Sequence, residues 1–449
     1  MKTFLNFFTG IALTTSLLLA TTSCDRFDNI QPEPKPQGQA RVGDFGFANS
    51  GFDPALFAQK IEAQLTGKVP GFGYRIIING QPYTKGVNGG GKSRFMIDAP
   101  ERNYTSGVRQ DIGSCSKLMT ALLVIKVLER NSLSIEEKVW KYCPSYFKPS
   151  ADFKKVTFRD LLAHTSGVIK HGNHPDTKGQ LADMQDCYEN GIYDATDINT
   201  IVNGPLPGKY LATKPFGQYA YSNAGYGVCR VALPYLVAIK ENPELLQTLK
   251  NAEGNYDQIN LAVATAFRSL LRTEVFLPAG LTWHNYIDLK AWGSPINELT
   301  KYYNPSSPQP PTSDDDDWEP ASNIVNPNLA GSNNGNSFLA SGSGGLYMNA
   351  DEVAQVVAAM RANKIVKYEI VELMKLGDGK GNQMGFDNGT AGKHGTYYHK
   401  NGSGSGGNAV LLDFDGAGVN VQVAITTNKK GTDVSNTYIW TKLFDESWR

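Results

Sequence analysis

The chain has 449 residues, of which 41% are hydrophobic, so it can bury a large core and is long enough for two or three domain-sized units. Lysine plus arginine and aspartate plus glutamate both number 43, which leaves no net charge and no basic surplus for holding phosphates. We therefore expect no nucleic acid partner. The five cysteines show no C-x-x-C spacing, so neither a zinc site nor an iron–sulfur cluster is expected.

The N-terminal segment has the features of an export signal. Residues 1–23 carry an early lysine, a mostly apolar run and small residues before Cys24, and the run is too short and interrupted for a spanning helix. Its end resembles the lipobox of bacterial lipoproteins, in which the cysteine is lipidated, although Thr21 stands where leucine is usual. Residues 24–48 include a polar, proline-rich stretch that suits a tether. We expect a lipid-anchored cell-envelope protein, in the periplasm or at the cell surface; the alternative is a soluble secreted protein.

The two ends of the remaining chain both predict sheet structure flanked by a helix. Asparagine-glycine and aspartate-glycine pairs between apolar runs indicate hairpin turns. The expected elements are a helix from Asp53, a strand at 74–78 with a turn at Asn79-Gly80 and a return at 81–87, strands at 410–414 and 419–427 joined by a turn at Asp415-Gly416, and an amphipathic segment at 434–448.

Between these ends the periodicity predicts mostly helices, at 115–130, 157–163, 234–251, 257–273 and 351–362. The simplest architecture is an α+β domain over residues 49–449, with an antiparallel sheet flanked by the N- and C-terminal helices and a mostly helical part inserted. The sheet part takes about 49–110 and 340–449, and the helical part about 111–339. Residues 302–335, with several prolines and four aspartates in a row, read as a solvated insertion without the spaced ligands of a calcium loop.

A serine and a lysine lie three positions apart where a long apolar helix begins. At this spacing Ser114 and Lys117 share a helix face with side chains roughly 5–6 Å apart. Burial would lower the pKa of the lysine, so the pair has the chemistry of a nucleophile and its base. The alternative is that Ser114 is only a helix N-cap and the spacing arose by chance. Cys115 would face the core as an inert thiol, and export would permit a disulfide between Cys143 and Cys187.

Two further polar stretches carry residues suited to a catalytic site. Tyr221 and Asn223 are two positions apart, so in extended backbone a phenol and an amide face the same way. Lys400 begins a glycine-rich stretch just before a strand, where Gly402 would let a ligand approach the backbone closely. Its positive charge would hold a substrate carboxylate and favour a tyrosinate or a neutral neighbouring lysine.

Together these motifs resemble those of the penicillin-recognising serine hydrolases. The matches are S-x-x-K at Ser114 and Lys117, Y-x-N at Tyr221 and Asn223, K-x-G at Lys400 and Gly402, and the L-L-x-H-T-S-G signature at residues 161–167. The tyrosine of the middle motif points to the class C β-lactamase branch, which also includes D-alanyl-D-alanine peptidases and esterases. The resemblance covers roughly residues 69–430 and implies a β-lactamase/transpeptidase-like fold.

The resemblance also implies a role for each matched residue. The oxyanion hole would use backbone N–H groups at a helix start and at the K-x-G strand. The implied roles are acylated nucleophile for Ser114, shared proton acceptor for Lys117 and Tyr221, substrate amide binding for Asn223, electrostatic anchor for Lys400, oxyanion donors for Ser114 and Ser403, further substrate-binding positions for Asn401 and Gly402, and a structural role for His164. Asn401 departs from the usual threonine, which bears on carboxylate recognition.

We therefore expect an exported serine hydrolase that forms an acyl-enzyme on amide or ester substrates and needs no metal or cofactor. A D-alanyl peptide of the cell wall, or a peptidoglycan fragment, suits an exported lipoprotein with a lysine for the carboxylate. A β-lactamase or a carboxylesterase would use the same atoms. A different class of function is a non-catalytic lipoprotein that binds wall fragments, which would need neither Ser114 nor Lys117.

Overall fold

The computed structural model describes residues 51–84, 88–96, 100–167, 170–171, 210–211, 216–281, 299–305, 318–320, 342–379, 381–404, 406–429 and 433–449. Residues Ser50–Arg449 form one compact unit. The expected signal peptide, the tether and Cys24 lie outside the described residues, as does Cys187. Within the described ranges, none of the helices combines the length and the apolar character that crossing a bilayer requires.

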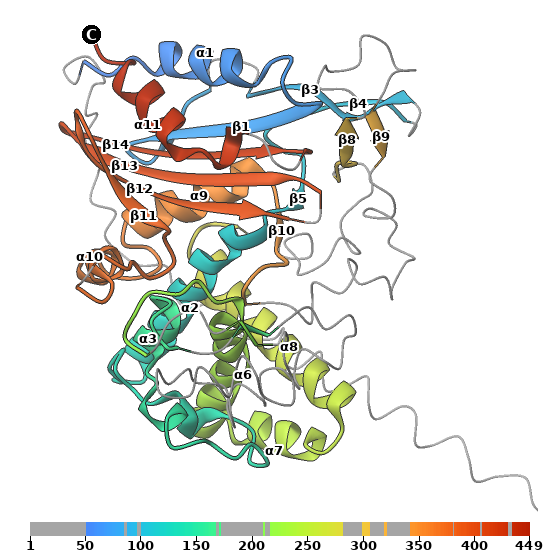
Figure 1. The fold of residues 1–449 in the computed structure, drawn as a ribbon, viewed down its shortest axis with the longest axis vertical. Helices are drawn as coiled ribbons and strands as arrows, with labels where there is room; N and C mark the ends of the chain where they lie inside the picture. Colours follow the sequence, from blue (N-terminus) through green and yellow to red (C-terminus); the bar gives the residue numbers. More distant parts are fainter. Residues whose placement is uncertain are drawn as a thin grey trace, which may run out of the picture. The chain divides into compact units, whose positions relative to one another are not determined.

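An antiparallel sheet with the strand order β11-β12-β13-β14-β1-β3-β4, and with β2 paired to β1, organises the unit (Figure 1). Its strands are β1 (Gly71–Ile78), β2 (Gln81–Pro82), β3 (Gly89–Arg94), β4 (Arg102–Asn103), β11 (Asn388–Gly392), β12 (Gly395–Ser403), β13 (Asn408–Gly416) and β14 (Val419–Thr427). β1 pairs with β14, so the sheet joins the two ends of the chain through its central hydrogen bonds. The predicted α+β fold class with such a sheet is confirmed.

The alternation of side chains along the strands divides the interior into two cores. On one face, Ile76, Val423 and Phe414 pack with the helices α1 (Pro54–Leu65) and α11 (Thr437–Asp445). On the other face, Ile77, Ala424 and Leu411 pack with the rest of the helices, among them α9 (Ala350–Arg361), which lies on β1 and β14. Figure 1 shows α1 and α11 on the opposite side of the sheet from α9.

Between β5 (Gln110–Asp111) and β10 (Tyr347–Met348), which pair with each other, the residues that the structure describes are mostly helical. The described helices of this part are η4 (Gly113–Cys115), α2 (Ser116–Arg130), η5 (Val139–Tyr142), η6 (Phe153–Lys155), α3 (Phe158–Leu162), α6 (Asn223–Lys240), α7 (Pro243–Ala252), α8 (Tyr256–Leu271) and the π-helical turn η7 (Arg272–Phe276). A further helix, α10 (Tyr368–Leu376), follows α9. The short elements are β6 (Lys170–His171), β7 (Tyr210–Leu211), β8 (Tyr303–Pro305), β9 (Trp318–Pro320) and η9 (Asp433–Ser435). α2 is buried on nearly all sides, as its apolar sequence predicts.

Three local predictions are wrong. Asp415 and Gly416 remain in β13, and the turn falls on Ala417 and Gly418, which both have positive φ. The expected helix at 234–251 is two helices, because α6 starts at residue 223, carries Pro234 inside it and ends before Asn242 caps α7. The return strand expected at 81–87 is only two residues long where it is described.

The expected solvated insertion begins too early at residue 302. Tyr302 and Tyr303 are buried at the sheet edge, where the Asp111 N–H donates to the Tyr302 hydroxyl at 2.9 Å and the Tyr303 N–H donates to the Asn428 carbonyl at 3.1 Å. The prolines and aspartates that follow in the sequence led to the prediction that Tyr302 and Tyr303 also belong to the solvated insertion. Residues 306–317 and 321–341 lie outside the described residues.

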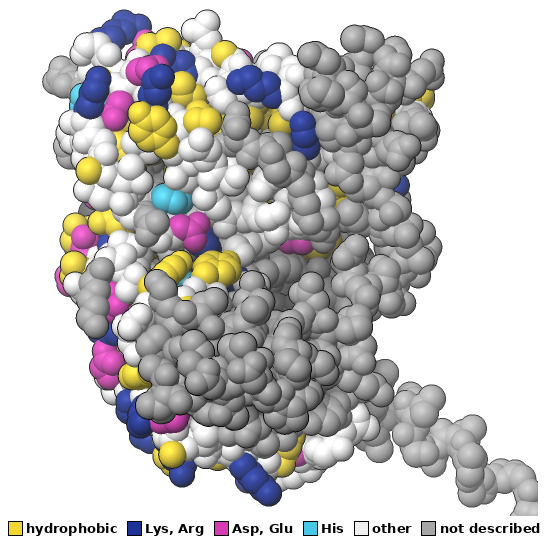
Figure 2. Space-filling model, in the orientation of Figure 1, with side chains coloured by type: hydrophobic (Ala, Val, Ile, Leu, Met, Phe, Trp, Pro, Cys, Tyr) yellow, Lys and Arg dark blue, Asp and Glu magenta, His cyan; other side chains and the backbone are white. Residues whose placement is uncertain are grey.

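Charged side chains of both signs are interspersed over the described part of the face shown in Figure 2. This pattern fits the balanced composition of the chain, with 43 basic and 43 acidic residues. On this face the described residues therefore present no large field of a single sign.

Candidate active site

The turn that carries Ser114 is fixed by backbone contacts. Gly113 has a φ of +53°, and its N–H donates to the Asp111 carboxylate at 2.8 Å. A side chain at Gly113 would meet the backbone of Ser403 at 2.5 Å, so only glycine fits between the turn and β12. Ser114 lies in η4 just before α2 and is partly exposed, while Cys115 beside it is fully buried.

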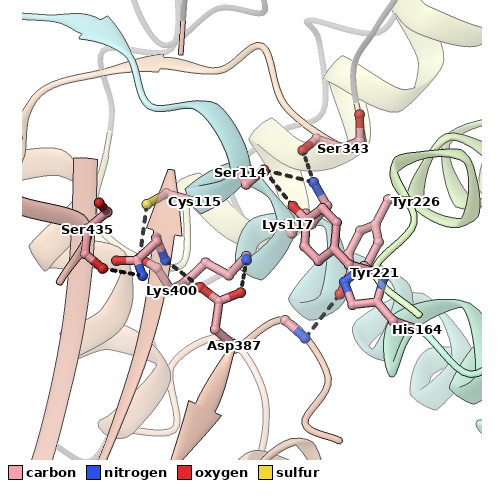
Figure 3. A network of polar contacts seen from close by, with 12 residues as sticks. Ser114, Cys115, Lys117, His164, Tyr221, Tyr226, Ser343, Asp387, Lys400 and Ser435 are labelled. Carbon is pink, nitrogen blue, oxygen red and sulfur yellow. Dashed lines mark hydrogen bonds and ion pairs between the residues drawn. The ribbon is translucent and has the colours of Figure 1, made fainter. Parts of the chain in front are cut away.

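Lys117 is completely buried and is held by three oxygen atoms. Its Nζ lies 3.0 Å from the Ser114 Oγ, 2.8 Å from the Asn223 Oδ1 and 2.5 Å from the Ser343 carbonyl. Figure 3 shows the contacts with Ser114 and Ser343. The amide oxygen and the carbonyl only accept hydrogen bonds, so they take the two N–H groups of a neutral lysine. The lone pair that remains points to Ser114, which is the arrangement a general base needs.

The environment of Lys117 favours this neutral form. Burial lowers the pKa of Lys117 well below its ordinary value, and the charge of Lys400 lowers it further, while Asp387 acts in the opposite direction. Burial acts most strongly because an ammonium group loses more hydration than an amine. The expected lowering of the lysine pKa is thus present in the structure.

Tyr221 completes the contacts of Ser114. Its hydroxyl donates to the Ser114 Oγ at 2.7 Å, and its ring lies near both amines, with the Lys117 Nζ 4.9 Å and the Lys400 Nζ 5.2 Å from the ring centroid. Burial raises the pKa of Tyr221 to about 12, so the group is a phenol at neutral pH. Of the two forms that the charge of Lys400 was expected to favour, a tyrosinate or a neutral neighbouring lysine, the structure supports the neutral lysine. Lys117 therefore has the surroundings of a base, and Tyr221 has those of a proton donor.

His164 positions Tyr221 from behind. The two rings lie 4.5 Å apart, and the His164 Nδ1 accepts a hydrogen bond from the Ser222 N–H at 3.1 Å. The Ala220 N–H donates to the His164 carbonyl at 2.8 Å, so both neighbours of Tyr221 are tied to this residue. Burial holds the pKa of His164 well below its usual range, and the positive charge of Lys400 acts in the same direction. A neutral imidazole with its Nδ1 already occupied is a support and not a base for Ser114.

Strand β12, which carries Lys400 and Gly402, lies directly against the turn that carries Ser114. A Cβ at Gly402 would overlap the Ile112 carbonyl oxygen and lie 2.9 Å from the Cys115 nitrogen. The Cys115 thiol donates to the Lys400 carbonyl at 3.2 Å, and burial raises the pKa of this thiol to about 12, as expected of an inert core cysteine. Gly402 therefore serves the close approach of two backbones, η4 and β12.

The other predicted strand residues differ in where they point. The Ser403 backbone nitrogen lies beside Gly113, next to the turn, and its side chain is exposed. The Asn401 amide donates to the Ser435 carbonyl at 2.9 Å, so this side chain is bound to η9. Lys400 is buried and forms an ion pair with Asp387.

Sequence reasoning missed two groups of this site as functional positions. The Ser343 carbonyl holds Lys117, and the adjacent glycines were the available signal for a backbone contact. Asp387 pairs with Lys400 across the β11–β12 hairpin, and nothing in its local sequence marks it. Cys143 carries a free thiol whose sulfur contacts the Val139 carbonyl at 3.8 Å, and Cys187, the other half of the expected disulfide, lies outside the described residues.

This arrangement has counterparts among solved structures. The crystal structure of FmtA from Staphylococcus aureus superposes with a TM-score of 0.58 and 17% identity over 88% of this chain and 90% of that one. A β-lactamase/D-alanine carboxypeptidase from Yersinia pestis gives a TM-score of 0.57 and 17% identity over 88% and 99% of the two chains. This is the β-lactamase fold.

Sequence comparisons agree with the fold. Residues 57–234 of this β-lactamase-fold chain match the family model described as Beta-lactamase, a range that contains the S-x-x-K and Y-x-N motifs. Teichoic acid D-alanine hydrolase from Staphylococcus aureus (strain MRSA252) is 28% identical over 141 residues, which are 31% of this chain and 29% of that protein. The first curated relatives are matched over only 23–29% of their own length. The predicted resemblance is confirmed, and the matched relatives include hydrolases, the enzyme class that the motifs indicated.

The contact between β12 and the nucleophile turn can be tested at Gly402. We expect Gly402→Ala to slow labelling of Ser114 by a fluorophosphonate by about 10²–10³, the usual effect of a lost oxyanion donor, because the new methyl group pushes β12 off the turn. The measurement is the second-order labelling rate of folded protein. Gly107→Ala is the matched control, since its Cβ would meet only the Thr105 Oγ1 at 3.8 Å. Equal rates for both variants would contradict this role.

The assignment of Lys117 as the base predicts a pH dependence. Its neutral form is required, so the labelling rate should rise with pH along a one-proton limb that lies below the ordinary lysine pKa of 10.5. The pKa of Tyr221 is raised to about 12, so ionisation of its phenol should not lower the labelling rate at neutral pH. The groups that face Lys117 are Ser114, Cys115, His164, Tyr221, Asn223, Tyr226, the Ser343 carbonyl, Asp387 and Lys400. A rising limb that lies at or above pH 10.5, where an ordinary lysine loses its proton, would exclude a base of lowered pKa.

Proposed function

We propose that this protein is a serine hydrolase that forms an acyl-enzyme on Ser114 and acts on D-alanyl or related small amide and ester substrates. One observation carries the proposal: the Ser114 Oγ is within hydrogen-bond distance of the Lys117 amine at 3.0 Å and of the Tyr221 phenol at 2.7 Å. A binding module has no need of a buried neutral base beside a partly exposed hydroxyl. The names of two relatives, a teichoic acid D-alanine hydrolase and a D-alanine carboxypeptidase, support the substrate class.

In the first half of the reaction the Ser114 Oγ attacks the substrate carbonyl while Lys117 takes the hydroxyl proton. The negative charge that develops on the carbonyl oxygen would be held by the backbone N–H groups of Ser114 and Ser403. The bond to the leaving group then breaks, and Tyr221 donates a proton to the departing nitrogen or oxygen, regaining one from Lys117. Asn223, which is exposed and holds Lys117 through its oxygen, has its amide nitrogen left for the substrate.

In the second half, water takes the place of the leaving group. Lys117 removes one proton from the water as it attacks the acyl carbonyl, and collapse of the intermediate returns that proton to the Ser114 Oγ. The products are a carboxylic acid and the free enzyme. A β-lactam or a simple ester would follow the same steps, so these remain alternative substrates for the same atoms.

The nucleophile can be tested with Ser114→Ala. We expect a fluorophosphonate to label the protein covalently and the substitution to abolish the labelling, because no other described hydroxyl contacts both Lys117 and Tyr221. Intact mass and peptide mapping are the measurements. Ser116→Ala is the matched control, since the Ser116 hydroxyl is buried and accepts from the Leu346 N–H at 3.3 Å. Labelling that persists in Ser114→Ala would favour the non-catalytic binding lipoprotein.

We also propose that the protein is exported and lipid-anchored through Cys24, because residues 1–23 have signal-peptide character and the following residues suit a tether. In a bacterial host fed labelled palmitate, the protein should incorporate the label and fractionate with membranes. Cys24→Ser should lose both properties, whereas Cys143→Ser should keep them. A soluble, unlabelled wild-type protein would instead indicate simple secretion.

A further inference from the structure

The amine that the resemblance assigns to a substrate carboxylate already has a carboxylate partner. Lys400 is 2% exposed, and its Nζ forms an ion pair with the Asp387 Oδ1 (Figure 3). The other oxygen, Oδ2, accepts a hydrogen bond from the Asn401 N–H at 2.8 Å. Both oxygens of Asp387 are therefore bound to the same strand end, one by a charge and one by the backbone.

The backbone fixes Asp387 in this position. It directly precedes β11, whose first residue pairs with His399, and the Asp387 N–H donates to the His399 carbonyl at 2.8 Å. The hairpin register thus places the carboxylate beside Lys400. A side chain held by its own backbone, by Asn401 and by an ion pair loses little entropy in making this contact.

The charges around Ser114 therefore balance before any substrate binds. Lys117 is neutral in the reactive form, and Lys400 and Asp387 cancel each other. A substrate carboxylate brought to Lys400 would have to compete with a carboxylate that is already tethered there, and it would lie next to a like charge. An uncharged group meets neither obstacle.

We propose, on the basis of the proposed hydrolase function, that Asp387 is a specificity residue that cancels the charge of Lys400 and selects substrates whose leaving group carries no carboxylate. The substrate class is then a D-alanyl ester or amide with a neutral or cationic leaving group. Peptides that end in a free D-alanine carboxylate, and penicillins with their carboxylate, are poor substrates of this site. Ester-linked D-alanine fits the class, since hydrolysis releases an alcohol.

Two thioesters that differ at one group provide the test. N-acyl-D-alanyl thioesters of mercaptoacetate and of mercaptoacetamide share the scissile bond, and both release a thiol that is measured colorimetrically. Wild-type protein should hydrolyse the uncharged thioester with a kcat/KM about tenfold or more above that of the carboxylate. Asp387→Asn should raise kcat/KM for the carboxylate thioester about tenfold, mainly through KM, and change the uncharged one much less.

Two further readings separate this role from a structural one. Asp387→Asn should move the rising limb of the pH profile to lower pH, because the negative charge of Asp387 no longer favours the ammonium form of Lys117. Asp387→Glu, which keeps the charge, should keep the wild-type preference and pH limb. Thermal unfolding identifies any variant that has not folded, and Asp387→Glu then remains as the folded comparison with the wild type.

The outcomes distinguish the two proposals. A wild-type preference for the carboxylate thioester, equal losses on both thioesters in Asp387→Asn and Asp387→Glu, or labelling of Ser114 without turnover of either thioester would overturn the specificity role alone. A wild-type protein that neither reacts with a fluorophosphonate nor hydrolyses either thioester would overturn the hydrolase function, and the specificity role with it.

Discussion

The burial of Lys117 is the constraint on which the site depends. Burying an ammonium group away from water costs free energy, so burial favours the neutral amine. Three oxygen atoms surround the Lys117 nitrogen and can form hydrogen bonds with that neutral form. These oxygens come from η4, from the start of α6 and from the segment before β10, so the folded core must bring three distant segments together. The burial that lets α2 fill the core also lowers the pKa of the lysine beside Ser114.

The reactive oxygen lies between two supports of different kinds. On the side of α6, His164 holds Tyr221, because its ring packs against the phenol and its carbonyl and Nδ1 bind the residues on either side of Tyr221. On the side of the sheet, the backbone of β12 contacts the backbone of the turn that carries Ser114, so positions 113 and 402 have no room for a side chain and are both glycine. One side therefore supplies side chains, and the other supplies backbone.

The charge balance departs from what the motifs implied. In the resemblance Lys400 is an open anchor, whereas here it is buried against Asp387. This ion pair leaves Tyr221 a phenol near two amines, with burial as the main cause of its raised pKa. A single charge next to Ser114, Lys117 and Tyr221 can alter the substrate class of a site without any change in their geometry.

The sequence by itself determined the contact between Ser114 and Lys117, the fold class and the sheet built from both chain ends, because these rest on spacing and periodicity. Ser114 and Lys117 meet through one helical turn, and the apolar sequence of α2 already required burial of the lysine. Boundaries set by packing were less accessible: Pro234 lies within α6, and Tyr302 is buried at the sheet edge. Only the tertiary structure decided which groups surround the amines. Asp387 reaches Lys400, and Asn401 turns to Ser435, through strand register and side-chain direction, which no local pattern encodes.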